Sequence, residues 1–304
     1  MNFQYLKKCA GLALLLGALT ACEAPVETKK PGVAIPPQRT AESFYQQVEL
    51  RLRKAGLMRT ETNPPDARFD YDDLVQDFRD IALYDEYEID AGVFVARRTP
   101  AYLRKWQRPV NVGMIFGPGV TAEQRARDRE TVAQYTRRLA KLTGLEMSMT
   151  DASRANMLLL VVAEEETGSV VDNLPTRFRF PGSAVNDALR NSPRDVFCAA
   201  FAFSDDLKRG EYEGALILVK AEHGALMRQS CVHEEMAQAM GLPNDSKNAR
   251  PSIFNDDEEF ALLTVHDEIL LQMLYDPRLR PGMTEAQVLP LLPQIARDAA
   301  GFGS

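Results

Sequence analysis

The residues with the greatest capacity for chemistry lie in one segment, residues 231–256, which reads CVHEEMAQAMGLPNDSKNARPSIFND. His233 and Glu234 could begin a His-Glu-x-x-His zinc site, but Ala237 stands where the second histidine is required. On a helix of 3.6 residues per turn, His233 also points roughly 140° away from Gln238. These side chains cannot bind one ion together, so the histidine register is excluded.

Moving the register by one residue gives a closer match. Residues 234–245 have the spacing of a longer zinc motif, in which the helix ends at a glycine, here Gly241, before the third metal ligand. A short segment stands where that motif is followed by a turn containing methionine, and it consists of Ser252, Ile253 and Phe254. On these positions the chain resembles the metzincin proteases, over roughly residues 106–275.

More closely, the chain resembles an uncharacterised family of bacterial envelope lipoproteins, a domain of unknown function. That family is recognised by the acidic site helix, the Gly-Leu-Pro-Asn-Asp loop at residues 241–245 and the Ser-Ile-Phe-Asn turn at residues 252–255. The resemblances imply an α/β (α+β) fold. It would be a metzincin-like mixed sheet with a long first helix, a site helix and a closing C-terminal helix, preceded by a small helical N-terminal region.

The metzincin resemblance also implies a role for each site position. The three zinc-binding histidines correspond to Glu234, Gln238 and Asn244, so none of the three is an imidazole. The general-base glutamate is retained as Glu235, and the turn methionine corresponds to Phe254. Zinc prefers imidazole and thiolate ligands, and a catalytic site usually supplies three strong ones. We therefore expect no bound metal, no other cofactor and no protease activity.

Two other interpretations of the site helix stay open. Oxygen ligands suit a hard cation such as Ca²⁺ or Mg²⁺, above all if Asp245 or Asp256 joins the site. Glu235 would then be the general base of an atypical hydrolase that uses zinc, calcium or magnesium. Alternatively, the helix is an ordinary amphipathic element whose apolar stripe packs on a sheet, with Glu234, Glu235 and Gln238 in water.

The N-terminus resembles that of a bacterial lipoprotein. Lys7 and Lys8 precede an uncharged apolar run at residues 10–19, and small residues lead to Cys22. A basic start, a short apolar run and small residues define a secretory signal, and the run is shorter than the about 20 residues that span a bilayer. We expect a lipid on Cys22 that anchors the chain to the periplasmic face of the outer membrane, which Glu23 favours over the inner membrane.

Composition and cysteine usage narrow the class of protein. With 45% hydrophobic and 26% charged residues, the chain has a globular composition, and its net charge of −7 argues against a nucleic-acid partner. Of its four cysteines, Cys9 leaves with the signal and Cys22 takes the lipid. In an oxidising compartment the remaining pair, Cys198 and Cys231, forms a disulfide or stays as two buried thiols, and the sequence leaves both open.

Hydrophobic periodicity and chain breakers predict four parts. Residues 1–21 are the signal, residues 22–40 a proline-rich tether, residues 41–90 a helical region and residues 91–304 the α/β domain. Helices are predicted at 41–57, 71–83, 121–144, 223–240 and 256–274, followed by a last helix capped by Thr284. Strands are predicted at 110–116, 146–149, 157–163, 197–203 and 215–219, with a surface excursion at 164–194.

Charge is distributed unevenly along the chain. Residues 61–90 hold eleven acids and two bases, whereas residues 97–141 hold eleven bases and three acids. Because opposite charges attract, we expect these blocks to pack together, in preference to the basic block meeting anionic lipid or cell-wall polymer. His266 shares an apolar face and is expected in the core with a hydrogen bond, with Asp267 and Glu268 beside it in water.

Three functions remain compatible with the sequence. The preferred one is a metzincin-like domain without protease activity, which binds or scaffolds an envelope protein or peptide. The second is a metal-dependent hydrolase with Glu235 as its base, and the third is a structural lipoprotein whose likeness to a protease is accidental. Likeness of fold alone would not establish an activity.

Overall fold

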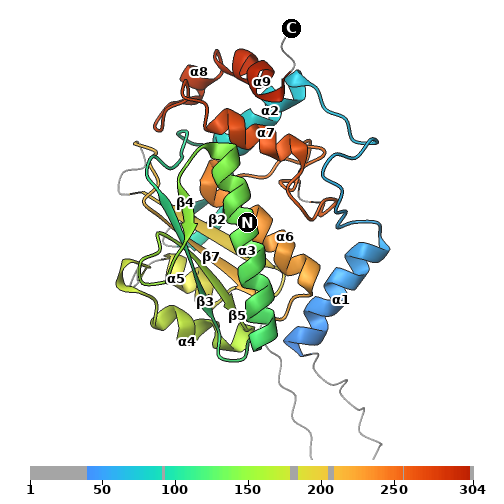
Figure 1. Cartoon of the computed structure of the whole chain (residues 1–304), viewed down its shortest axis with the longest axis vertical. Helices are drawn as coiled ribbons and strands as arrows, with labels where there is room; N and C mark the ends of the chain where they lie inside the picture. Colours follow the sequence, from blue (N-terminus) through green and yellow to red (C-terminus); the bar gives the residue numbers. More distant parts are fainter. Residues whose placement is uncertain (1–39, 91–92, 179–183, 205–208, 256, 302–304) are drawn as a thin grey trace, which may run out of the picture. The chain divides into compact units, whose positions relative to one another are not determined.

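A five-stranded sheet forms the centre of the structure (Figure 1). The computed structural model describes residues 40–304 except 91–92, 179–183, 205–208, 256 and 302–304. The predicted signal and Cys22 lie outside the described residues, which all belong to one unit, Arg39–Ser304. Among the helices of this described part, none combines the length and the apolar character needed to cross a bilayer.

The sheet is mixed, with one antiparallel edge. Its strands are β3 (Val110–Phe116), β4 (Met147–Met149), β5 (Met157–Val162), β6 (Cys198–Phe203) and β7 (Gly214–Lys220). They lie in the order β4-β3-β5-β7-β6, in which only β6 runs against its neighbour and pairs Cys198 with Val219. All five predicted strands are present, and the predicted mixed α/β class is confirmed.

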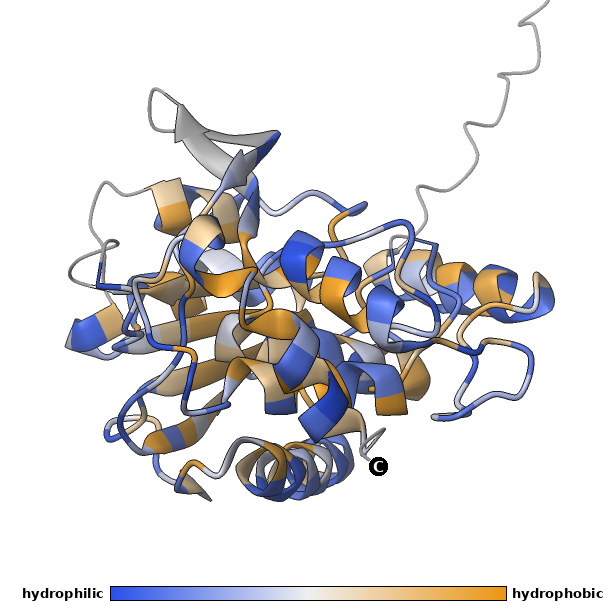
Figure 2. Ribbon diagram, turned by 90° about the horizontal axis from the view of Figure 1, so that it is seen from above, coloured by the Kyte–Doolittle hydropathy of each residue, from blue (hydrophilic) through white to orange (hydrophobic). Residues whose placement is uncertain are grey.

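Helices cover both faces of the sheet, because its central strands are buried on both sides. Alternate residues of β5 point to opposite cores. One core contains α3 (Ala122–Thr143) and α6 (Ala225–Gly241), and the other contains α4 (Thr167–Asp172) and α5 (Ala184–Arg190). Figure 2 shows hydrophobic ribbon concentrated between these layers. The predicted surface excursion at 164–194 is therefore wrong, because the described residues of this segment form a layer of the domain.

The N-terminal region is not purely helical. It has α1 (Ala41–Lys54) and α2 (Tyr71–Ala82), but a two-stranded antiparallel hairpin follows, β1 (Tyr84–Asp90) and β2 (Val93–Pro100). The sequence of β1, YDEYEID, has no apolar run, so periodicity did not indicate a strand. The expected boundary at residue 91 falls inside this hairpin.

The helix predicted at 256–274 begins later than expected. Helix α7 is Val265–Leu274, not 256–274, and its N-cap Thr264 accepts a hydrogen bond from the Asp267 backbone in a capping box. The preceding residues are not helical because they bond to the segment after α1: Met58 N donates to Glu258 O at 2.8 Å. Short helices complete the chain, α8 (Glu285–Val288) after the predicted cap Thr284 and α9 (Leu292–Ala300).

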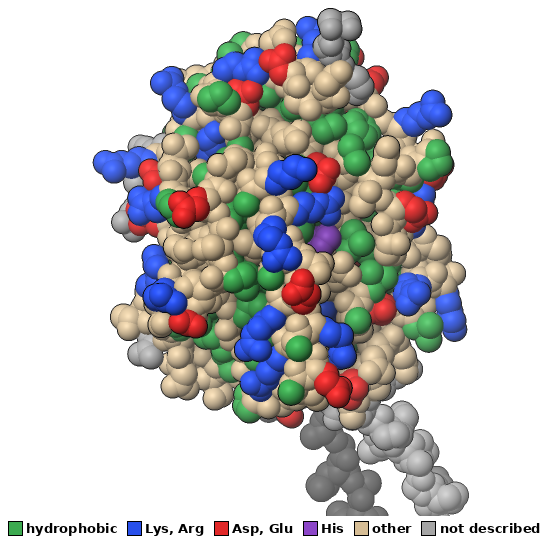
Figure 3. All heavy atoms as spheres, viewed as in Figure 1, with side chains coloured by type: hydrophobic (Ala, Val, Ile, Leu, Met, Phe, Trp, Pro, Cys, Tyr) green, Lys and Arg blue, Asp and Glu red, His purple; other side chains and the backbone are tan. Residues whose placement is uncertain are grey.

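The predicted pairing of the acidic and basic blocks is found only in part. Arg98 contacts Asp80 at 2.6 Å, and Arg104 pairs with Asp85. On α3, by contrast, Arg125 donates to backbone carbonyls and the Arg129 guanidinium lies 4.8 Å from the centre of a Phe ring, so the prediction is wrong for this helix. Lys and Arg side chains follow α3 on the face drawn in Figure 3, interspersed with a few acids.

A buried charged network joins α2 to α7. His266 Nε2 lies 3.0 Å from Asp77 Oδ2 and His266 Nδ1 lies 3.5 Å from Asp267 Oδ1, with His266 and Asp267 fully buried. His266 is thus the predicted core histidine, whereas the prediction that Asp267 faces water is wrong. Burial by itself lowers the pKa of His266, but the contacts with Asp267 and Asp77 outweigh burial and raise the pKa to about 9.

We predict that Asp77→Asn costs about 3 kcal/mol of unfolding free energy, because it leaves a buried cation with one partner fewer. A raised histidine pKa contributes stability that is complete below pH ~6.5 and is lost as pH rises through about 9. Urea unfolding at pH 6 and pH 9.5 should therefore show the variant's deficit shrinking at the higher pH. Asp80→Asn on the same helix, at a partly exposed pair, is the matched control and should cost under about 1 kcal/mol.

Candidate functional site

The C-terminal end of α6 is held by two ring side chains. Trp106 Nε1 donates to Ala239 O at 2.8 Å and the Tyr275 hydroxyl donates to Met240 O at 2.8 Å. Carbonyls at a helix end lack intrahelical donors, so these bonds satisfy groups that would otherwise be buried unpaired. The helix ends at Gly241, whose φ is 122°, and a Cβ there would lie 2.1 Å from a backbone oxygen. This position therefore requires glycine.

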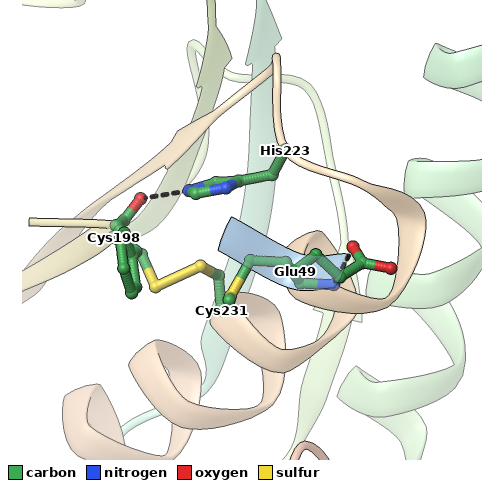
Figure 4. The surroundings of a disulfide bond; sticks show 6 residues. Glu49, Cys198, His223 and Cys231 are labelled. Carbon is green, nitrogen blue, oxygen red and sulfur yellow. Dashed lines mark hydrogen bonds between the residues drawn. A yellow bond between two sulfur atoms is a disulfide. The ribbon is translucent and has the colours of Figure 1, made fainter. Parts of the chain in front are cut away.

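A disulfide joins α6 to the edge strand β6 (Figure 4). Cys198 and Cys231 have their sulfurs 2.20 Å apart, and of the two arrangements that the sequence left open this is the one in the structure. Cys231 is fully buried, whereas Cys198 is half-buried. Near the start of α6, Glu49 of α1 accepts a hydrogen bond from Met227 N at 3.2 Å. Both ends of α6 are therefore fixed by other parts of the chain.

Two carboxylates on α6 lie beside this disulfide. One oxygen each of Glu234 and Glu235 and the sulfur of Cys198 lie within 4.8 Å of one another. Glu235 is only 4% exposed, and its Oε2 has no hydrogen-bond partner among the described residues. The interpretation that placed Glu234, Glu235 and Gln238 in water is therefore wrong for Glu235. Glu234 and Gln238 are half-buried.

Burial and neighbouring acids favour the protonated form of both carboxyls. Burial raises the pKa of Glu235 well above its usual range, and the charges of Asp245, Glu86 and Glu258 raise it further. Burial, then Glu235 and the same three acids, raise the pKa of Glu234 well above its usual range. We call these five residues, Glu86, Glu234, Glu235, Asp245 and Glu258, the acidic cluster.

The acidic cluster combines the distant Glu86 with four acids from the α6 helix and the segment after it, within residues 234–258. Asp245, one of the two further acids that the sequence offered as ligands, comes from the loop after α6, and the other, Asp256, lies outside the described residues. Glu86 was not predicted as a site residue because strand β1 was not predicted, and Glu258 was not because that residue was expected in a helix. Glu258 has φ 59°, in the left-handed region that non-glycine residues seldom adopt. The only sequence signal for Glu86 was the density of acids in residues 61–90.

Other expected site positions are part of the scaffold. The side-chain amide of Asn244 is buried and donates to Asp80 O at the end of α2 at 2.7 Å. Ser252 Oγ and Ile253 N donate to the buried Asp267 carboxylate at 2.6 and 3.1 Å, and Phe254 is fully buried. Of the expected residues, the structure thus brings together Glu234, Glu235 and the two cysteines.

The two histidines near α6 are neutral. His233 Nδ1 accepts from Leu263 N at 3.1 Å, and burial, then the charge of Arg138, lowers the pKa of His233 to about 3. Burial lowers the pKa of His223 to about 4, and its Nε2 lies 2.9 Å from Phe197 O. Neither therefore supplies a positive charge to the acidic cluster at neutral pH.

The donor set beside the disulfide does not fit a catalytic zinc. With the S–S bond closed, Cys198 supplies no thiolate, and the two nearest carboxyls favour their protons. Metal ligands must be deprotonated, and zinc needs several strong donors. What the arrangement offers instead is a partly enclosed group of acids that a positively charged group would stabilise.

Comparison with protein families places the chain in one of them. A family model described as a protein of unknown function (DUF2927) matches residues 71–294. No curated protein matches the chain. The matched segment includes α2, the β1–β2 hairpin, the whole sheet and α6, so it contains every member of the acidic cluster.

We predict that Glu235→Gln raises the stability of the chain above pH 4.5. A carboxyl with a raised pKa holds its proton in the folded state after the unfolded state has released it, so folding becomes less favourable as pH rises from 4.5. The glutamine avoids this cost, and urea unfolding should show a larger gain at pH 8 than at pH 4.5. Glu130→Gln, at an exposed residue of α3, is the control and should show no such trend, whereas an equal loss at both pH values in Glu235→Gln would contradict the buried-carboxyl interpretation.

Proposed function

The chain belongs to the DUF2927 family of proteins of unknown function, and on that premise we propose that it is a lipid-anchored binding module of the bacterial envelope. In this proposal its α/β domain has a metzincin-like framework without protease activity. Its ligand is a positively charged segment of an envelope protein or peptide. The ligand binds at the acidic cluster.

The observation that carries this proposal is the state of Glu235. A general base must be ionised before it can accept a proton, but Glu235 is 4% exposed and surrounded by acids that raise its pKa. The positions that would hold zinc have Glu234, Gln238 and Asn244, and the Asn244 amide bonds to α2. A metalloprotease requires a bound catalytic metal and an ionised general base. The residues at this site favour neither.

The order of the elements supports the metzincin-like part of the proposal. A long helix, α3, follows the first strand of the sheet, and the only antiparallel strand, β6, lies at an edge. The site helix α6 follows the last strand, and a buried turn at Ser252, Ile253 and Phe254 precedes α7. This is the sequence of elements expected from the resemblance.

The choice of ligand follows from charge. Burial and then neighbouring acids raise the pKa values of Glu234 and Glu235, so both carboxyls would be stabilised in their ionised form by a cation brought close to them. A lysine or arginine side chain on a partner would supply that charge and would let the carboxyls ionise. The half-buried position of Glu234 leaves it in reach of such a side chain.

We predict that the oxidised mature chain binds a fluorescent octapeptide of alternating lysine and alanine and does not cleave it. Glu234→Gln and Glu235→Gln should each weaken binding about tenfold, the effect of losing about 1.4 kcal/mol. Fluorescence anisotropy measures the binding, and mass spectrometry of the peptide measures cleavage. Glu130→Gln should bind normally. Cleavage that disappears in Glu235→Gln would establish the hydrolase instead, and equal binding by all variants would place the ligand elsewhere.

The lipid anchor predicts a separate result. In a bacterium grown with labelled palmitate, the chain should carry the label and sediment with membranes, because two or three acyl chains give firm anchoring. Cys22→Ser should abolish the label and release the chain from the membrane fraction. Cys9→Ser is the matched control and should behave like the wild type, since Cys9 lies in the predicted signal. A labelled Cys22→Ser protein would refute the assignment.

A further inference from the structure

Helix α6 presents three potential metal ligands on one side, and β6 presents a fourth. Cys231, Glu234 and Glu235 are three and four residues apart, the spacing at which helical side chains are neighbours. Cys198 begins β6 and is bonded to Cys231. The Cys198 sulfur and one oxygen each of Glu234 and Glu235 lie within 4.8 Å of one another, so these three side chains surround one small volume. Cys231 adjoins it through its bond to Cys198.

An unsatisfied polar atom points to a missing partner in this volume. Glu235 Oε2 is buried and has no hydrogen-bond partner among the described residues, although a buried polar atom usually has one. Glu235 is also one of the residues whose oxygen approaches the Cys198 sulfur. The Glu235 carboxyl thus lies beside the disulfide with one buried oxygen free to accept a further partner.

We propose that reduction of the Cys198–Cys231 disulfide converts this group into a zinc site of two thiolates and two carboxylates. Zinc in proteins is usually bound by four tetrahedral ligands, which include cysteine sulfur at about 2.3 Å and carboxylate oxygen at about 2.0–2.2 Å. Two sulfurs on one zinc ion therefore lie about 3.8 Å apart. In the structure they are bonded to each other, so the site forms only after the S–S bond breaks.

The chemistry balances with a dithiol as the reductant. One thiolate of the dithiol attacks the sulfur of Cys198, a half-buried residue, and Cys231 leaves as a thiolate. The second thiol of the reductant then displaces Cys198, so the reductant becomes a cyclic disulfide and the protein gains two electrons and two protons. Zinc binding releases the protons of both thiols and of any protonated carboxyl.

This site is separate from peptide binding, although it uses two of the same residues. The proposed function concerns the oxidised chain and a cationic peptide, whereas the zinc site exists only in the reduced chain. Zinc is measured here without peptide, and the peptide is measured without reduction. One proposal can therefore fail while the other stands.

The test compares zinc content in the two redox states of the mature chain. One portion stays oxidised, and another is reduced with dithiothreitol, desalted under nitrogen, mixed with one equivalent of zinc and dialysed. Elemental analysis should find about one zinc per reduced chain and little in the oxidised chain. Cobalt in place of zinc should give a thiolate-to-metal charge-transfer band. Glu234→Gln and Glu235→Gln should lower the zinc affinity, and Glu130→Gln should not.

Three results would overturn the proposal. The first is a reduced, folded chain that retains no zinc, and the second is equal zinc in both redox states. The third is loss of the far-ultraviolet circular dichroism on reduction in the presence of zinc, because a metal bound by β6 and α6 would hold these elements together in place of the disulfide. Cys198→Ser adds an independent check, since it removes a ligand and should abolish zinc binding in reducing buffer.

Discussion

Most of the site depends on one buried charged network, His266 with Asp77 and Asp267. Charges inside a protein are tolerated only with partners, so the two acids and the histidine fix α2 against α7. Asp267 also accepts bonds from Ser252 and Ile253, which fixes the turn after the site helix. Removing one member would therefore disturb the packing of three segments together.

The position of α2 in turn shapes the acidic cluster. Asn244, in the loop after α6, bonds to Asp80 O on α2, and the next residue, Asp245, is a member of the cluster. The hairpin that follows α2 brings in Glu86. Acids from separate segments can be held this close because protons neutralise some of them. The scaffold therefore determines the protonation of Glu234 and Glu235.

Elements whose structure is set by residues close together in the sequence could be predicted, whereas features set by contacts between distant residues could not. Strands such as β5 are apolar along their whole length, and α3 has a clear cap, so local pattern sufficed for them. The start of α7 was missed because it depends on residues 58 and 59, which pair with Glu258 and Glu259. Glu86 was missed for the same reason: no local pattern relates a polar hairpin to a helix about 150 residues later. The spacing around Glu235 identified the site, but its burial is a tertiary property.

The structure also bears on why the site has carboxyls and no histidines at the positions of the zinc ligands. If Glu234 and Glu235 were only a solvated remnant of a protease site, we would expect both side chains to be exposed and ionised. Instead Glu235 is buried at a cost in desolvation, within 4.8 Å of a disulfide that links α6 to β6. A glutamine at that position would bury the same volume without the charge, so stability alone does not account for the carboxyl. A carboxyl retained at this cost is better explained by a positively charged group that it binds, a partner's side chain in the oxidised chain or a metal ion in the reduced one.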